Sequence, residues 1–183
     1  MLRTERLELS LPVASDTDAI FAACQDPGIQ RYTTVPSPYE RHHAEEFIPR
    51  VAAGWAAGSD LTWAIREGAT VAGMIGLYRV AGGAAELGYW MSPALRGRGL
   101  VTEAARAVID WAFSDGGPRV ARVEWRAVVG NIASARAART LGFRYEGLLR
   151  KALTSPRGRD DSWIAGLLRS DDRMPQHWPV LEG

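Results

Sequence analysis

The sequence is poor in cysteine, and this scarcity excludes two kinds of site. Cys24 is the only cysteine among the 183 residues, so the chain can form neither an internal disulfide nor a cysteine-rich zinc site. A lone thiol is typical of a reducing, cytoplasmic setting. We interpret Cys24 as a small buried apolar side chain rather than as a nucleophile.

The sequence also lacks an excess of one charge and a long apolar run. Its 22 Lys and Arg side chains exceed its 21 Asp and Glu side chains by a single charge, whereas dedicated nucleic-acid binders usually carry a strong basic excess. No segment approaches the roughly 20 apolar residues of a membrane-spanning helix, and residues 1–6 lack the apolar core of a signal peptide. We expect a cytoplasmic protein that binds neither nucleic acid, membrane nor metal.

The chain length and the apolar periodicity predict one domain of mixed helix and strand. A length of 183 residues suits a single domain, and residues 1–183 contain no repeat or long linker. Apolar residues at helical spacing predict helices over residues 16–24, 40–57, 100–113 and 131–141. Alternating or continuous apolar runs predict strands over residues 7–11, 61–66, 71–78, 85–91, 120–129, 143–153 and 163–168. This order of elements predicts an α/β or α+β sandwich.

The most informative segment, residues 86–104, runs from a strand through a glycine- and arginine-rich loop into a helix. The start of a helix offers backbone N–H groups without partners and favours an anion. Gly97 and Gly99 allow close approach and a positive φ, and Arg96 and Arg98 add positive charge suited to phosphate oxygens. The segment predicts a pyrophosphate site, with a solvated turn as the alternative.

Two other phosphate-binding loops do not fit this segment. A nucleotide-hydrolase loop would end in Gly-Lys-Ser or Gly-Lys-Thr, and the segment contains neither. A dinucleotide-binding fingerprint would need a third glycine, whereas Thr102 stands at that place after Gly97-Arg98-Gly99.

A second group of polar side chains opens the helix at residues 131–141. Asn131 is a good helix cap, and its amide could instead bind a carbonyl or hydroxyl group of a ligand. Ser134 follows within one turn, so its hydroxyl can face the same cleft. From the residues alone, both interpretations of Asn131 stay open.

Taken together, these motifs resemble the GNAT superfamily of acyl-CoA-dependent N-acyltransferases. More narrowly, they resemble its RimJ/RimL-like branch, which acetylates protein N-termini and other amines. The resemblance covers nearly the whole chain, and it is specific for the family rather than for a substrate. The matching motifs, in chain order, are Thr4-Glu5-Arg6-Leu7, Glu86-Leu87-Gly88-Tyr89-Trp90, Arg96-x-x-Gly99, Asn131-x-x-Ser134, Leu141-Gly142-Phe143 and Glu146-Gly147.

The resemblance implies a fold and an activity. The expected fold is a mixed, mostly antiparallel sheet flanked by helices, with a splayed central strand pair. The expected activity is direct transfer of an acetyl group from acetyl-CoA, as co-substrate, to a primary amine, by a monomer or a homodimer. The alternatives are a catalytically idle acyl-CoA-binding sensor and the use of another donor such as succinyl-CoA. The amine itself is not identified.

The resemblance also implies roles for particular residues. In the family, the loop amides hold the CoA pyrophosphate, the strand end at Met91 pairs with the pantetheine arm, and Asn131 contacts that arm. Ser134 matches the serine proposed to protonate the departing thiolate. The implied cofactor-binding residues are Met91, Arg96, Gly97, Arg98, Gly99, Leu100, Val101, Thr102, Asn131 and Ser134.

Two positions depart from the family pattern. Val101 stands where the loop commonly has glycine or alanine. Ala138 stands where many relatives carry an acid tyrosine, which leaves the acid role to Ser134 or to solvent.

The attacking amine must also lose a proton. We predict that Glu86, acting through water, accepts it, with an exposed strand-end carboxylate as the alternative.

Four other polar side chains could face the acceptor. Asp160 and Asp161, in an expected loop at residues 155–161, could attract a cationic amine or simply lie in a solvated turn. His42 and His43, on the early helix, could border the acceptor cleft.

Overall fold

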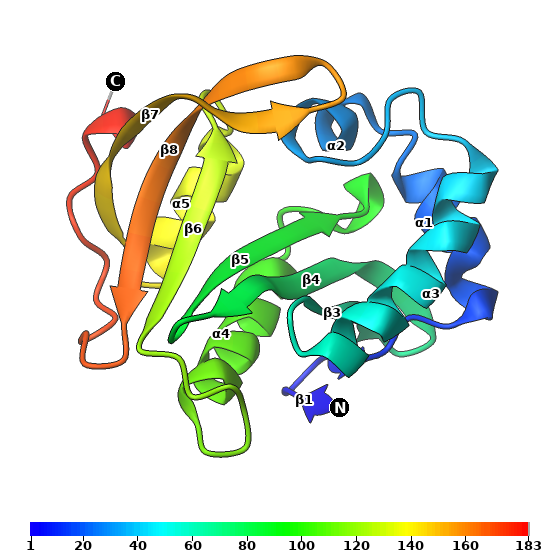
Figure 1. Ribbon diagram of the computed structural model, residues 1–183, viewed down its shortest axis with the longest axis horizontal. Coiled ribbons are helices and arrows are strands. Elements are labelled where there is room, and N and C mark those ends of the chain that lie inside the picture. Colours follow the sequence, from blue (N-terminus) through cyan, green and yellow to red (C-terminus); the bar gives the residue numbers. More distant parts are fainter. Residues whose placement is uncertain (183) are drawn as a thin grey trace.

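The computed structural model describes residues 1–182, which form one sheet with helices on both faces (Figure 1). The helices are α1 (Thr17–Ala23), α2 (Pro27–Tyr32), α3 (Arg41–Ala57), α4 (Leu100–Phe113) and α5 (Ile132–Thr140). The strands are β1 (Leu2–Arg3), β2 (Glu8–Ser10), β3 (Leu61–Glu67), β4 (Thr70–Ala81), β5 (Ala84–Met91), β6 (Arg122–Val128), β7 (Arg144–Ser155) and β8 (Gly158–Leu168).

The strands described in residues 1–182 lie in the order β1-β2-β3-β4-β5-β6-β8-β7. Within this part of the chain, β5 and β6 are parallel neighbours and all other neighbours are antiparallel. Pairing between β5 and β6 joins residues 84–87 to residues 122–125 and stops there, although β5 continues to Met91 and β6 to Val128. The two strands therefore splay apart (Figure 1). The predicted mixed, mostly antiparallel sheet with a splayed central pair is confirmed.

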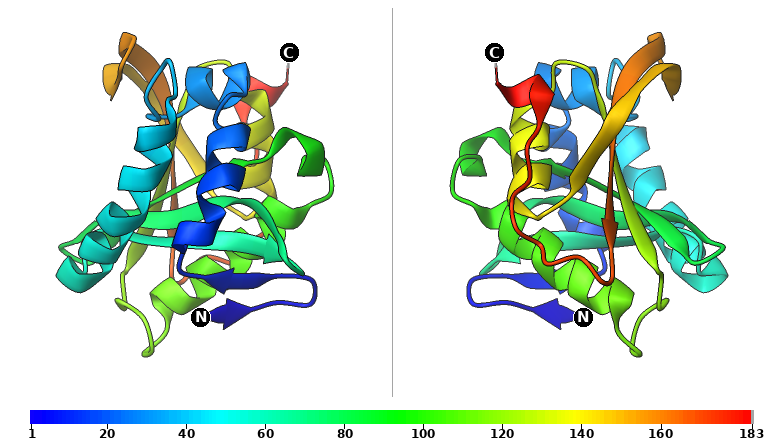
Figure 2. Two further views of the ribbon diagram at one scale, coloured as in Figure 1. Left: turned by 90° about the vertical axis from the view of Figure 1, so that its right-hand side faces the viewer. Right: turned by 90° about the vertical axis from the view of Figure 1, so that its left-hand side faces the viewer.

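Helices α4 and α5 pack on one face of the sheet, and α1 and α3 pack on the other (Figure 2). The apolar residues of α4 recur at helical spacing and face the sheet. Its alanines leave room for the helix backbone to lie close to the strands. The buried residues of α4 are Leu100, Ala104, Ala105, Val108, Ile109, Ala112 and Phe113. The helix begins and ends where the apolar spacing predicts.

Cys24 lies in the smaller cluster on the opposite face, where it packs with Ile20, Ala64 and Met74. Its side chain is 1% exposed, and burial raises the pKa of the thiol to about 12. The interpretation of Cys24 as an apolar core residue is confirmed.

Two segments differ from the sequence-based expectation. Helix α2 is not among the predicted helices, because Asp26-Pro27-Gly28 is equally typical of a turn. The side chain of Asp26 caps this helix by accepting from the Ile29 N–H at 2.9 Å, and Pro27 occupies its first position. The expected loop at 155–161 is also wrong, because β7 runs to Ser155 and β8 begins at Gly158.

Candidate functional site

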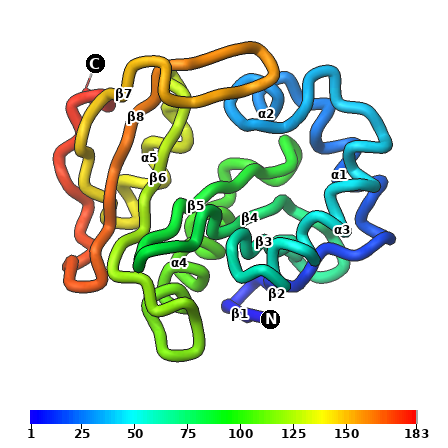
Figure 3. The backbone as a smooth tube through the Cα atoms, viewed as in Figure 1, coloured from blue at the N-terminus to red at the C-terminus, as the bar shows by residue number. Residues whose placement is uncertain are grey.

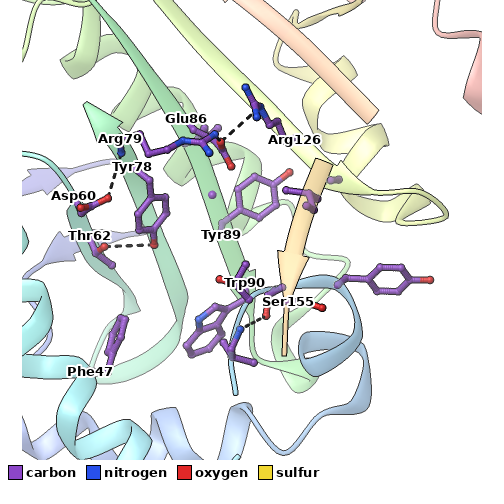
Figure 4. A pocket seen from close by; sticks show the side chains of 18 of the residues that line it. Phe47, Asp60, Thr62, Tyr78, Arg79, Glu86, Tyr89, Trp90, Arg126 and Ser155 are labelled. Carbon is purple, nitrogen blue, oxygen red and sulfur yellow. Dashed lines mark hydrogen bonds and ion pairs between the residues drawn. The ribbon is translucent and has the colours of Figure 1, made fainter. Parts of the chain in front are cut away.

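A cavity of ≈ 750 Å³ opens where β5 and β6 separate. Its walls come from α3, from the loop after α2, from β4, β5 and β6, from the start of α5 and from the end of β7. We call the gap between the separating ends of β5 and β6 the fork. Figure 4 shows the side chains that point into the cavity from both sides of the fork. The cavity therefore reaches from the α4/α5 face of the sheet to the face covered by α3.

The tip of the β7–β8 hairpin reaches over to α2 (Figure 3), and residues 153–155 at the end of β7 line this cavity. The Arg157 guanidinium donates to the carbonyl oxygens of Gln30 and Arg31, the latter at 2.5 Å. Asp160 lies 3.4 Å from the Arg31 guanidinium and 3.7 Å from that of Arg157. Asp160 therefore stabilises the contact between the hairpin tip and α2, and it does not line the cavity.

The glycine-rich loop leads into α4 with the geometry that an anion site requires. Gly97 and Gly99 have φ values of 76° and 75°, which is the left-handed region that favours glycine. Gly99 is the N-cap residue and provides no side-chain hydrogen bond. The first N–H groups of α4, from Leu100 to Thr102, have no partner within the helix. They can therefore bind the oxygens of an anion.

Arg96 and Arg98 do not extend freely from this loop. The Arg96 guanidinium lies 2.7 Å from Asp26 and donates to the Met91 carbonyl oxygen at 3.2 Å. Arg98 makes a bidentate ion pair with Glu67, with both contacts at 2.7 Å. The positive charge predicted for phosphate binding is present, and in this structure it is compensated by two carboxylates.

Asn131 and Ser134 lie at the start of α5, inside the fork. The Asn131 Oδ1 accepts from the Ser134 N–H at 3.3 Å, so Asn131 does cap the helix and it also lines the cavity. The Ser134 Oγ lies 3.0 Å from the Tyr89 hydroxyl and accepts from the Trp125 Nε1–H at 3.0 Å. The sequence-based reasoning missed Tyr89 and Trp125 as partners of this serine.

Glu86 is the third residue of β5 and points into the cavity on the α3 face (Figure 4). Its side chain is only 19% exposed and pairs with the guanidinium groups of Arg79 and Arg126, the latter at 3.8 Å. The carboxylate is therefore partly buried rather than exposed. Two guanidinium groups therefore lie beside this carboxylate.

Arg79 reaches Glu86 because β4 bulges at this point. The register of β4 and β5 shifts between Tyr78 and Ala81, and Arg79 has a φ of 54°, which is uncommon outside glycine. The Arg79 N–H donates to the Asp60 carboxylate at 3.2 Å, which holds this conformation. Bulges commonly redirect a side chain next to a functional site, and no sequence pattern marked this one.

The floor of the cavity on the α3 face is the ring of Tyr78. A Cβ atom on either Gly76 or Gly88 would lie 2.8 Å from this ring, and the two glycines are directly opposite each other on β4 and β5. The glycines leave the space that the ring occupies. The Tyr78 hydroxyl contacts the Thr62 hydroxyl at 3.4 Å.

The two histidines predicted to border the acceptor cleft differ in position. His43 lines the cavity, and its Nδ1 accepts from the Glu40 N–H at 2.9 Å. The side chain of His42 is 51% exposed and does not line it. Asp161 accepts from the Lys151 N–H at 2.9 Å and also lies outside the lining.

Two kinds of feature are absent from residues 1–182. No helix there combines the length and the apolar character needed to cross a bilayer. No three His, Cys, Asp or Glu side chains in the same part of the chain come together as metal ligands would.

Comparison of sequences identifies the relatives of this chain. Residues 6–144 match the acetyltransferase (GNAT) domain family. A 105-residue stretch is 31% identical to the "Probable N-acetyltransferase YjcK" of Bacillus subtilis (strain 168). This match covers 56% of the chain and spans 57% of the length of YjcK.

Comparison of structures finds the same fold. The microcin C7 self-immunity acetyltransferase MccE, solved with acetyl-CoA and AMP, superposes with a TM-score of 0.81 at 20% identity, over 90% of this chain and 93% of MccE. RimL, a ribosomal L7/L12 alpha-N-protein acetyltransferase solved with coenzyme A, superposes with a TM-score of 0.80 at 19% identity, over 90% of this chain and 95% of RimL. The resemblance stated from the motifs is confirmed.

Proposed function

The chain belongs to the GNAT acetyltransferase family, and we propose that it transfers the acetyl group of acetyl-CoA directly to a primary amine. The acceptor is an amine of a protein N-terminus or of a small molecule. RimL, which superposes on this chain, is described as an alpha-N-protein acetyltransferase, and this supports an N-terminus as the first acceptor to test.

The observation that carries this proposal is the open fork between β5 and β6 with the start of α4 beside it. Beyond Leu87 and Trp125 the two strands no longer pair with each other, so an extended ligand can pass between them. The free N–H groups of α4 follow β5 through the loop at residues 92–99. A thioester cofactor with a diphosphate needs both features.

The chain's own residues then take the following roles. The amides of residues 97–102 bind the diphosphate, with Arg96 and Arg98 adjacent, and Met91 and Asn131 contact the pantetheine arm. The amine attacks the thioester carbonyl, so that a C–N bond forms and the C–S bond breaks. Glu86, through water, accepts the proton that the amine loses, and Ser134 donates a proton to the sulfur.

The direct test is release of thiol from acetyl-CoA in the presence of N-terminal peptides and small amines. Turnover with at least one acceptor supports the proposal, and a parallel assay with succinyl-CoA decides the donor. Absence of coenzyme A binding together with absence of turnover would refute it.

Replacing Glu86 by glutamine is expected to lower kcat/KM about tenfold, because the amide keeps the shape of the side chain but cannot accept a proton. The measurement is thiol release as a function of pH.

Glu124 supplies the matched control for this substitution. It stands directly opposite Glu86 on the neighbouring strand and contacts the same Arg126 at 3.0 Å, yet it does not line the cavity. Glu124→Gln is expected to keep the wild-type rate. Equal losses in both variants would mean that the charge network around Arg126, rather than proton transfer to Glu86, sets the rate.

Replacing Arg98 by alanine is expected to weaken coenzyme A binding only about threefold, because the guanidinium is already paired with Glu67 and is exposed. Glu67→Gln releases Arg98 and is expected to tighten binding slightly. Calorimetric titration with coenzyme A checks both. A loss of all binding in Arg98→Ala would show that this side chain, rather than the amides, holds the diphosphate.

A further inference from the structure

Three side chains from different elements meet where β5 and β6 separate. Leu87 and Trp125 form the last paired position of the two strands. Tyr89 lies two residues further on the same face of β5, and Ser134 lies in the first turn of α5. Tyr89, Trp125 and Ser134 all line the cavity at this point.

Trp125 engages one lone pair of the Ser134 hydroxyl. Its Nε1–H donates to the Ser134 Oγ at 3.0 Å, and an indole N–H can donate but cannot accept. Trp125 is 1% exposed, so water does not compete for this bond. The hydroxyl oxygen is thereby tied to β6.

Tyr89 also contacts the Ser134 hydroxyl. Its hydroxyl lies 3.0 Å from the Ser134 Oγ and 3.3 Å from the Ser134 carbonyl oxygen. Burial raises the pKa of Tyr89, and its hydrogen bonds to Ser134 and Trp125 offset only part of that rise. The phenol therefore keeps its proton at neutral pH and can donate it to the Ser134 carbonyl oxygen or to Oγ, since either oxygen of the 3.0 Å contact can be the donor.

We propose that Tyr89 and Trp125 are positioning residues that direct the only hydroxyl proton of Ser134 into the cavity. A serine hydroxyl has one proton and two lone pairs. When Tyr89 donates to Oγ, both lone pairs of the Ser134 oxygen are engaged, and its proton points away from the two donors to the space where a thioester sulfur would lie.

This inference rests on the proposed function, in which Ser134 assists departure of the thiolate. When the C–S bond breaks, its electron pair goes to sulfur and the proton passes from the Ser134 Oγ to sulfur. Ser134 regains a proton from solvent, and the proton lost by the amine leaves through Glu86. Tyr89 and Trp125 keep their protons throughout.

The test removes the hydrogen-bond donor of each side chain and keeps an aromatic ring in its place. Tyr89→Phe and Trp125→Phe are each expected to lower kcat about tenfold, while the KM for acetyl-CoA and the calorimetric affinity for coenzyme A stay unchanged. Tyr145→Phe is the matched control, because this ring packs on Trp178 outside the cavity lining. It is expected to keep the wild-type kcat.

A double-mutant cycle separates positioning from a general loss of packing. If Tyr89 acts through Ser134, the Ser134→Ala/Tyr89→Phe double variant has the same kcat as Ser134→Ala alone, whereas independent defects multiply. A readout without turnover is the side-chain N–H resonance of Trp125, identified by its loss in Trp125→Phe. It is expected to shift in Ser134→Ala and in Tyr89→Phe.

The outcomes distinguish this inference from the proposed function. A wild-type kcat in Tyr89→Phe, multiplying losses in the double variant, or an unmoved Trp125 resonance overturns the positioning role and leaves the acetyltransferase activity in place. A wild-type protein that turns over no amine overturns the proposed function, and this inference falls with it.

Discussion

Replacing Gly99 by valine is expected to weaken coenzyme A binding about 100-fold while the protein stays folded. Gly99 has a φ of 75°, where a β-branched residue is strongly disfavoured. Relaxation of this strain turns the N–H groups of Leu100 and Val101 away from their common direction. The nearest atom to an added Cβ is the Arg6 Nη2 at 3.8 Å, so the side chain itself meets open space. Calorimetric titration with coenzyme A measures the loss.

Gly82 supplies the control for this substitution. It lies in the turn between β4 and β5 with a φ of 58°, and an added Cβ would meet nothing within 4 Å. Gly82→Val therefore imposes similar backbone strain away from the cavity. It is expected to lower the melting temperature as Gly99→Val does and to bind coenzyme A like the wild type. Unchanged coenzyme A binding in Gly99→Val would show that the loop amides do not bind the diphosphate.

The parts of this site that depend on local sequence could be predicted. The apolar spacing of α4 identifies both ends of the helix, because every fourth or third residue must face the sheet. Gly97 and Gly99 mark the loop before it because left-handed backbone favours glycine. Asn131 identifies the start of α5 by its capping chemistry. Each of these signals lies within a few residues of the feature that it predicts.

The partners of the charged side chains could not be predicted, because they come from distant parts of the chain. Arg96 pairs with Asp26, 70 residues away, and Arg98 with Glu67, 31 residues away. Sequence alone shows two cations beside a glycine loop and gives no reason to expect two carboxylates. Helix α2, whose cap is Asp26, was missed because Asp-Pro-Gly is equally typical of a turn.

The polar network around Ser134 depends on where the sheet stops pairing. Tyr89 sits in a strand of alternating residues, where a large aromatic side chain is by default a core residue. Trp125 likewise alternates with polar residues in its strand, and it is buried. Their hydrogen bonds to one serine arise because β5 and β6 part at Leu87, and no local pattern reports the length of a parallel pairing.

Replacing Ser134 by alanine is expected to lower kcat about 100-fold, because the departing thiolate loses its hydrogen-bond and proton donor. Binding of coenzyme A is expected to stay close to that of the wild type, since the diphosphate contacts lie in the loop before α4. The variant also leaves the Trp125 N–H without its partner and removes one of the two partners of the Tyr89 hydroxyl, which is expected to cost about 1–3 kcal/mol of stability. Pre-steady-state thiol release and calorimetry measure the two effects.

Ser162 allows the catalytic and the structural parts of this loss to be separated. Its side chain is 0% exposed, and its hydroxyl has no hydrogen-bond partner within residues 1–182. Removing an unsatisfied buried hydroxyl costs no hydrogen bond, so Ser162→Ala is expected to match the wild type in kcat and to be at least as stable. Ser134→Ala could instead melt at a lower temperature than the wild type and keep its kcat. Ser134 would then have only a structural role, through its contacts with Tyr89 and Trp125, and solvent would protonate the thiolate.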